Sequence, residues 1–225
     1  MNVVEKPVED WSAPAREWIS GSGCDAILFH TYTETPLGYA GTWNRPLSSA
    51  QPGPYEAALD RWVNHFQRSG ITAIAAGGLV LRPRKGANWV ETFDVPTARD
   101  PGCGEHIHQM MEAKDWLSDP IFEDDLLKAV FRPADDVKLE RIQTVRDGRM
   151  GSPEIWASKT GGFRFKSDID EGAWRLINLC DGRTAVAEIV EKLCQEDRRP
   201  PEEVRSRALQ IVANLYGFAY LTRVS

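Results

Sequence analysis

The chain has 225 residues, of which 42% are hydrophobic and 27% are charged, and its formal net charge at pH 7 is −6. This composition is typical of a globular protein, and the acidic balance argues against a protein whose whole surface binds nucleic acid. The sequence contains no apolar run of the ~18 residues that a membrane helix needs and no leader-peptide pattern, so we expect a cytoplasmic protein without a membrane partner.

The first region, residues 1–96, is predicted to alternate strands and helices. Asn2–Val4 reads as a short strand, Ser12 is placed to cap the helix "APAREWI", and "CDAILFHTYT" reads as a strand that is buried on both faces. The helix "YEAALDRWVNHFQRSG" ends at Gly70. In the strand "ITAIAAGGLVLRP", Gly77 and Gly78 indicate a bulge or a close backbone approach. This order of elements is typical of an α/β layer.

Two further regions follow. Residues 97–134 are predicted to be a helical connector, because "GEHIHQMMEAKDWL" and "DPIFEDDLLKAVF" are amphipathic. Residues 135–225 begin with the strand patterns "VKLERIQTVRDG", "PEIWASKT" and "GFRFKS" and continue with three helices. Asp170 and Thr184 are the predicted N-caps of the first two helices, and Gly217 ends the third. Three helices with flanking strands favour a winged-helix domain.

The sequence carries no strong catalytic motif: GxGxxG after a strand, GxxxxGK[ST], GxSxG and HExxH are all missing. The catalytic residues are therefore unknown at this stage. Cys103, His106 and His108 are the best metal-ligand candidates, but on a helix the two histidines point to different faces, so no metal site is predicted. His30 and His65 are interpreted as structural histidines, which is the commoner case.

Two groups of residues are candidates for binding. Thr31, Thr33 and Glu34 follow a buried strand, where ligands of open α/β sheets bind, although a plain polar loop is the competing interpretation. The segment "WNRPL" is read as a loop that either recognises a ligand or seals a core edge.

In the last region, Arg164, Arg205 and Arg207 are candidate partner-binding residues. Nearby acidic residues such as Glu202 and Glu203 make nucleic acid an unlikely partner. A peptide or protein is favoured, because a strand edge beside the third helix accepts an added strand.

The segments "GSGCDAILFHTYTETPLGYAGTWN" and "YEAALDRWVNHFQRSGITAIAAGGLVLRP" together resemble the C-terminal half of a class I S-adenosylmethionine-dependent methyltransferase of the bacterial, HemK-like type. The resemblance makes "NVVE" the fifth strand, "DAILFHT" the sixth and "AGGLVLRP" the antiparallel seventh. The segment from "DIDEGAWRLINLC" to "ANLYGFAYL" resembles a PqqD-like winged helix. The implied fold is α/β and α+β: the C-terminal half of a Rossmann-like methyltransferase sheet, a helical connector and a winged-helix domain.

The resemblance implies S-adenosylmethionine as cofactor, but the glycine-rich cofactor loop and the Asn-Pro-Pro motif of the family are not in this chain. No catalytic residue is carried over, and the chain alone is expected to be inactive. Its implied partner is an upstream methyltransferase half, in cis or in trans. The alternative is a stand-alone winged-helix module that binds a peptide or a protein without catalysis.

Overall fold

A computed structural model describes residues 10–48, 52–96, 102–119, 121–146 and 149–224. The predicted strand Asn2–Val4 lies outside these residues. The chain divides into two compact units, residues 1–97 and 98–225, and the helices of the predicted connector belong to the second. Helices and small sheets are mixed in both units, which confirms a mixed α and β chain at that level. No helix in the described ranges is both long enough and apolar enough to cross a bilayer.

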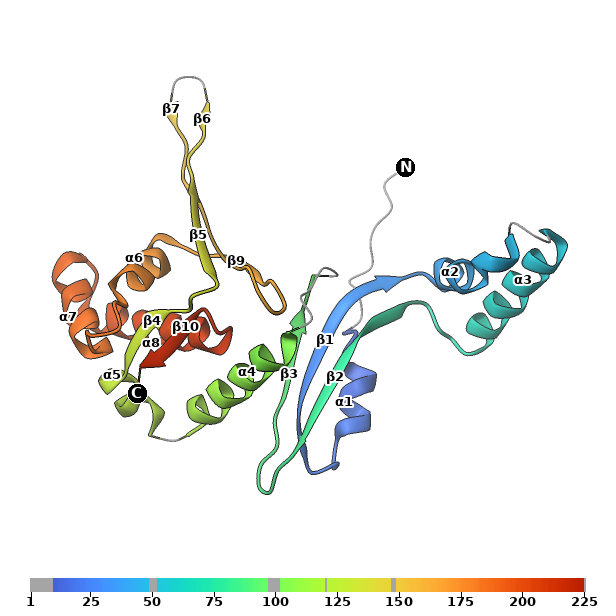
Figure 1. Ribbon diagram of the computed structural model, residues 1–225, viewed down its shortest axis with the longest axis horizontal. Coiled ribbons are helices and arrows are strands. Elements are labelled where there is room, and N and C mark those ends of the chain that lie inside the picture. The colour runs from blue at the N-terminus through green and yellow to red at the C-terminus, as the bar shows by residue number, and fades with distance from the viewer. Residues whose placement is uncertain (1–9, 49–51, 97–101, 120, 147–148, 225) are drawn as a thin grey trace. The chain divides into compact units, whose positions relative to one another are not determined.

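The first unit is built on a three-stranded sheet with the order β2–β1–β3 (Figure 1). The central strand β1 (Cys24–Glu34) is antiparallel to β2 (Ile74–Pro83) and parallel to β3 (Val90–Asp94). Helix α1 (Ala13–Ile19) covers one face, where Ile19, Ala26 and Leu28 form a small core with Trp11, Ala15 and Val90. The apolar centre of β1 is buried as its sequence predicts.

Between β1 and β2 the chain forms a pair of helices, α2 (Pro36–Ser48) and α3 (Pro52–Arg68). The prediction of a loop at "WNRPL" is wrong, because this segment lies in α2 and Pro46 is inside the helix. Ring contacts of Tyr39 with Trp62 and Phe66 hold α2 against α3. This packing outweighs the weak helix propensity of the glycines and prolines in α2.

The second unit contains five helices in its described residues: α4 (Cys103–Leu117), α5 (Phe122–Lys128), α6 (Glu171–Leu179), α7 (Val186–Glu196) and α8 (Pro201–Gly217). Its strands are β4 (Val130–Pro133), β5 (Val137–Ile142), β6 (Val145–Arg146), β7 (Arg149–Met150), β8 (Glu154–Lys159), β9 (Lys166–Asp168) and β10 (Leu221–Val224). They form the antiparallel groups β10–β4, β5–β8–β9 and β6–β7.

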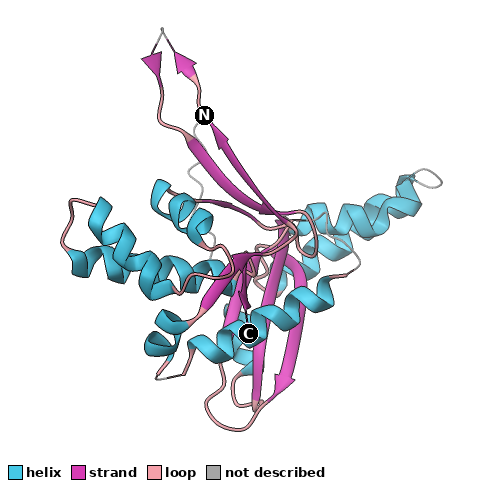
Figure 2. Ribbon diagram, turned by 60° about the vertical axis from the view of Figure 1, so that its left-hand side comes forward, coloured by secondary structure: helices cyan, strands magenta, loops and turns pink. Residues whose placement is uncertain are grey.

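The helices of this unit enclose a core that includes Leu126, Phe131, Leu176, Val212 and Tyr220. From it, β5 and β8 project as a long hairpin whose outer end is the β6–β7 pair (Figures 1 and 2).

Two predicted helix caps have different outcomes. Asp170 caps α6, and its Oδ1 accepts the N–H of Ala173 at 2.8 Å. Thr184 does not cap α7, whose N-cap is Ala185 and carries no capping side chain. The reason is that the Asp181 carboxylate accepts the backbone N–H of Thr184 at 2.8 Å and holds it in the preceding turn.

Candidate functional site

The carboxyl end of β1 contains a β-bulge. Opposite β2, His30 pairs with Gly77 and Tyr32 pairs with the adjacent residue Ala76, so Thr31 is the extra residue of the bulge. Side chains alternate between faces along a regular strand, so residues three apart point to opposite faces. The bulge removes this alternation and places His30 and Thr33 on the same face of the sheet.

Gly77 makes the bulge possible. A Cβ atom built on Gly77 would lie 1.8 Å from the carbonyl oxygen of Phe29, so the two backbones approach more closely than any side chain allows. The close backbone approach predicted for this glycine pair is confirmed at Gly77. At Gly78 a Cβ would meet nothing within 4 Å.

On this face, three polar side chains form a hydrogen-bonded row. His30 Nδ1 lies 2.7 Å from Asp94 Oδ1, and His30 Nε2 lies 2.8 Å from Thr33 Oγ1. A carboxylate only accepts hydrogen bonds, so with a neutral imidazole the proton is on Nδ1. Nε2 is then an acceptor, and the hydroxyl of Thr33 donates to it. A hydroxyl, a base and a carboxylate that orients the base are the components of a nucleophile-activating group.

The surroundings fix the histidine and leave the ends of the row accessible. The ring of Trp11 stacks on the His30 imidazole, with centroids 4.9 Å apart and planes inclined by 21°. The His30 side chain is 17% exposed and that of Asp94 is 83% exposed. Thr33 is exposed. The imidazole is thus held on three sides, while a molecule from solvent has access to the Thr33 hydroxyl.

The structure places the residues predicted at this strand end in three different roles. Thr33 joins the row, Thr31 is the half-buried extra residue of the bulge, and Glu34 is half-buried at the end of β1. Sequence analysis missed Asp94, because the short strand β3 was not predicted. His30 was interpreted as a structural histidine. Its neighbour Asp94 is brought to it only by the pairing of β1 with β3.

At the other end of β1, a buried carboxylate joins β1 to β2 by hydrogen bonds. Asp25 is fully buried and accepts hydrogen bonds from Arg82 at 2.7 Å and from Asn88 and the Trp89 N–H at 3.3 Å. Burial alone would raise the pKa of Asp25, but these hydrogen bonds and the nearby charge of Arg84 outweigh it and hold the pKa below its usual value. This cluster joins β1 to β2 at the end of the ladder opposite the bulge.

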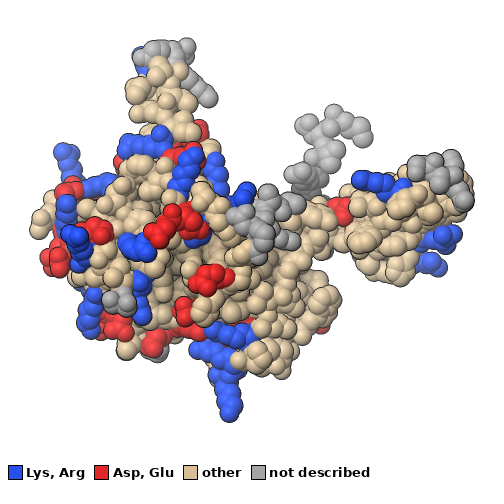
Figure 3. Space-filling model, viewed as in Figure 1, with Lys and Arg blue, Asp and Glu red and all other residues tan. Residues whose placement is uncertain are grey.

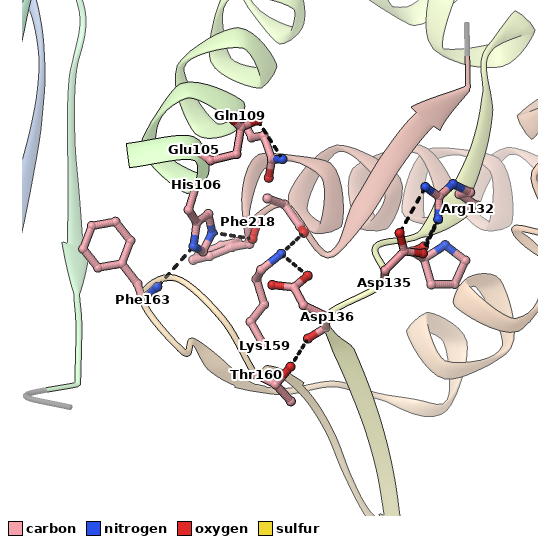
Figure 4. A network of polar contacts seen from close by, with 12 residues as sticks. Glu105, His106, Gln109, Arg132, Asp135, Asp136, Lys159, Thr160, Phe163 and Phe218 are labelled. Atoms are coloured by element: carbon pink, nitrogen blue, oxygen red, sulfur yellow. Dashed lines mark hydrogen bonds and ion pairs between the residues drawn. The ribbon is translucent and has the colours of Figure 1, made fainter. Parts of the chain in front are cut away.

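A second polar network lies inside the second unit (Figure 4). Lys159, whose side chain is 3% exposed, contacts Asp136 Oδ1 and the carbonyl oxygen of Ala219, each at 2.8 Å. His106 is also buried: its Nδ1 accepts the N–H of Phe163 and its Nε2 lies 3.3 Å from the carbonyl of Phe218. The network ties α4, the β8–β9 turn and the end of α8 together, which indicates a structural role.

Burial lowers the pKa of His106, and the positive charge of Lys159 lowers it further. The unfolded chain therefore binds this proton more readily than the folded chain. The contribution of His106 to the free energy of unfolding is complete above its usual pKa of 6.5 and is lost as the pH falls through the lower pKa of the folded state.

We therefore predict that the free energy of unfolding of the second unit decreases as the pH falls below 6.5, with a slope of at most about 1.4 kcal/mol per pH unit from this group. Urea unfolding followed by circular dichroism at several pH values measures it. The variant His106→Gln should lack this part of the slope, whereas His108→Gln, at an exposed ion pair with Glu112, should keep it. An equal slope in wild type and His106→Gln would contradict the prediction.

The two histidines weighed as candidate metal ligands are not brought together. His106 faces the buried network and His108 pairs with Glu112 on the surface. In the described ranges, no three side chains of His, Cys, Asp or Glu are arranged to hold a metal ion.

The three candidate arginines of the second unit do not form one patch. Arg164 lies in the turn between β8 and β9, and Arg205 and Arg207 are two residues apart on α8, so they point to different flanks. On the face drawn in Figure 3, Lys and Arg alternate with Asp and Glu over this unit. That face therefore offers no single-sign surface for a nucleic acid.

Arg207 borders a hollow of about 220 Å³ between α6, α7 and α8. The hollow is lined by apolar side chains and three arginines: Leu176, Leu193, Val204, Ala208, Ile211, Arg175, Arg199 and Arg207. Each guanidinium already pairs with a carboxylate, namely Glu196, Asp197 and Asp170 respectively. The rim is therefore close to neutral.

A family model described as a domain of unknown function, DUF7782, matches residues 108–218. The match begins within α4 and ends at the residue after α8, so it covers most of the second unit. No curated protein matches the chain.

Proposed function

We propose that this chain is the C-terminal part of a class I S-adenosylmethionine-dependent methyltransferase, without methyltransferase activity alone, which contributes sheet strands and contacts to a substrate or partner. The order of α1, β1 and the antiparallel β2 supports the proposal, because the resemblance implies a helix, a sixth strand and an antiparallel seventh strand. In the second unit, α6 to α8 and the β5–β8 hairpin support a winged-helix interpretation.

The observation that carries the proposal is the free edge of β2. Among the described residues, β2 pairs with β1 alone, and its leucines Leu79 and Leu81 are 48% and 46% exposed. They lie opposite Leu28 and Ala26 and so belong to the face that α1 covers on β1. This apolar face therefore continues beyond α1 and is not covered there.

Trp18 extends the same apolar surface. Arg16 reaches from α1 to the carbonyl of Val90 and to Thr92 on the β3 side. Trp18 is two residues further, about 200° around the helix, and so points to the β2 side, where it is 78% exposed. An open strand edge beside exposed apolar side chains favours pairing with a further strand. A methyltransferase half that supplies a covering helix and holds a strand against this edge meets this requirement.

The test is a reconstitution with the glycine-rich half of the methyltransferase, supplied as a separate polypeptide. We expect neither this chain alone nor its winged-helix part to bind S-adenosylmethionine, and we expect the mixture to bind it in isothermal titration calorimetry. Leu81→Lys should weaken association of the two polypeptides by at least about tenfold, or 1.4 kcal/mol. Ile142→Lys is the matched control, because Ile142 is also 46% exposed but lies on β5.

Two results would contradict the proposal. One is a glycine-rich half that is fully active without this chain and does not associate with it. The other is association that Leu81→Lys and Ile142→Lys weaken equally.

A second candidate function is a stand-alone module that binds a peptide or a protein. The apolar floor of the hollow between α6, α7 and α8 favours it, since a space of about 220 Å³ accepts one anchoring side chain. The three arginines at the rim are each paired with a carboxylate, so the rim does not select a partner by its charge. This proposal therefore has less support than the first.

A further inference from the structure

We propose that Thr33 is a nucleophile that accepts an acyl group from an ester, with His30 as its general base and Asp94 as the residue that positions the base. This activity does not depend on the proposed function, because it requires neither S-adenosylmethionine nor a second polypeptide. The three residues come from the carboxyl ends of the parallel strands β1 and β3.

The distances meet the requirement for an activated nucleophile. The hydroxyl lies 2.8 Å from Nε2, and Nδ1 lies 2.7 Å from the carboxylate, both within the range of about 2.6–3.2 Å for such a relay. Asp94 fixes the tautomer that leaves the Nε2 lone pair free. The Thr33 proton therefore has an acceptor before any substrate arrives.

The bulge is what assembles this row. In a regular strand Thr33 would lie on the face opposite to His30, and its hydroxyl would not reach Nε2. The extra residue Thr31 moves Thr33 to the face of His30, and Gly77 supplies the close backbone approach opposite. Bulges re-aim side chains in this way beside active sites. Trp11 then limits the rotation of the imidazole by stacking on it.

The charges favour an uncharged acyl ester over a phosphoryl group. Asp94 belongs to the row, so a carboxylate lies across the imidazole from the Thr33 hydroxyl. Its charge repels an anionic phosphate, whereas an ester carbonyl is neutral.

The reaction balances with the residues present. Thr33 Oγ1 attacks the carbonyl carbon, its proton passes to His30 Nε2, and a tetrahedral intermediate forms. The bond from the carbonyl carbon to the leaving oxygen then breaks, which leaves an acyl-Thr33 ester. The proton on His30 goes to the leaving group, or to solvent when the leaving group is a stable anion.

The probe is 4-nitrophenyl acetate, and the readouts are 4-nitrophenolate release and the position of the acetyl group by peptide mass spectrometry after an acid quench. We expect one acetyl group on Thr33. Thr33→Val should lose it, and His30→Gln and Asp94→Asn should form it roughly 100-fold more slowly. Thr33→Ser should retain it. Asp94→Glu should restore part of the rate, which a merely structural role for Asp94 does not predict.

The matched control is Thr72→Val, an exposed threonine in the loop before β2, which should be labelled at Thr33 like the wild type. Circular dichroism of each variant establishes that it is folded. Acetyl groups only on lysines or on His30, or an equal rate of burst release in wild type and Thr33→Val, would overturn the proposal. Absence of an acetyl group at position 33 in both the wild type and folded Thr33→Ser would also overturn it.

Discussion

Replacing Asp136 with alanine is expected to reduce the free energy of unfolding of the second unit by about 3 kcal/mol. The change removes the carboxylate that lies 2.8 Å from Lys159 Nζ, and Lys159 is 3% exposed. The ammonium group would then remain buried, with the carbonyl of Ala219 as its hydrogen-bond acceptor among the described residues. A buried charge that loses its partner is costly because water cannot replace the lost interaction.

The adjacent residue supplies the control. Asp135 pairs with Arg132 at 2.6 Å, but the two side chains are 86% and 44% exposed. Solvent screens exposed ion pairs, so Asp135→Ala should change the free energy of unfolding much less than Asp136→Ala. Urea unfolding followed by circular dichroism measures both variants. If Asp135→Ala and Asp136→Ala lower the free energy of unfolding equally, the prediction is wrong, because it depends on the burial of Lys159.

Gly77→Ala is expected to destabilise the first unit by about 1–3 kcal/mol, which is the range for forcing extra atoms into a packed site. Its Cβ would lie 1.8 Å from the Phe29 carbonyl oxygen, and that atom is backbone, so β1 and β2 must separate locally. Separation at this point disturbs the bulge. The same variant should therefore reduce acetylation of Thr33.

Gly78→Ala is the control for this prediction, because a Cβ there meets nothing within 4 Å. It should keep wild-type stability or gain slightly, since alanine restricts the unfolded chain more than glycine does. Thermal unfolding measures both variants. A Gly77→Ala protein as stable as Gly78→Ala, with undiminished labelling of Thr33, would refute the account of the bulge.

Local patterns were sufficient to predict much of the fold. The apolar centre of β1, the amphipathic α3 and the cap at Asp170 each depend on a few neighbouring residues, and each prediction is confirmed. Helix α2 could not be predicted in this way. Its glycines and prolines disfavour a helix, and the ring contacts that hold it come from α3.

The candidate site was predictable only in part, for a similar reason. Thr33 was named as a candidate because ligands of open α/β sheets bind beyond the carboxyl ends of the strands. Asp94 is 64 residues away from His30 in sequence, and its position depends on the parallel pairing of β1 with a five-residue strand. The glycine pair indicated a close backbone approach, but its assignment to Gly77 needed the register of β1 and β2.

The central claim is that β2 has a free edge, as it does among the described residues, and amide hydrogen exchange tests it most directly. In an antiparallel edge strand, alternate N–H groups point to the neighbouring strand and the others point outward. In this chain alone, the outward amides of Ile74–Pro83 should exchange much faster than those bonded to β1. Addition of the glycine-rich half should protect the outward amides and leave β10 unchanged. Outward amides that are already protected in the chain alone, or that stay unprotected in a mixture that binds S-adenosylmethionine, would contradict the account.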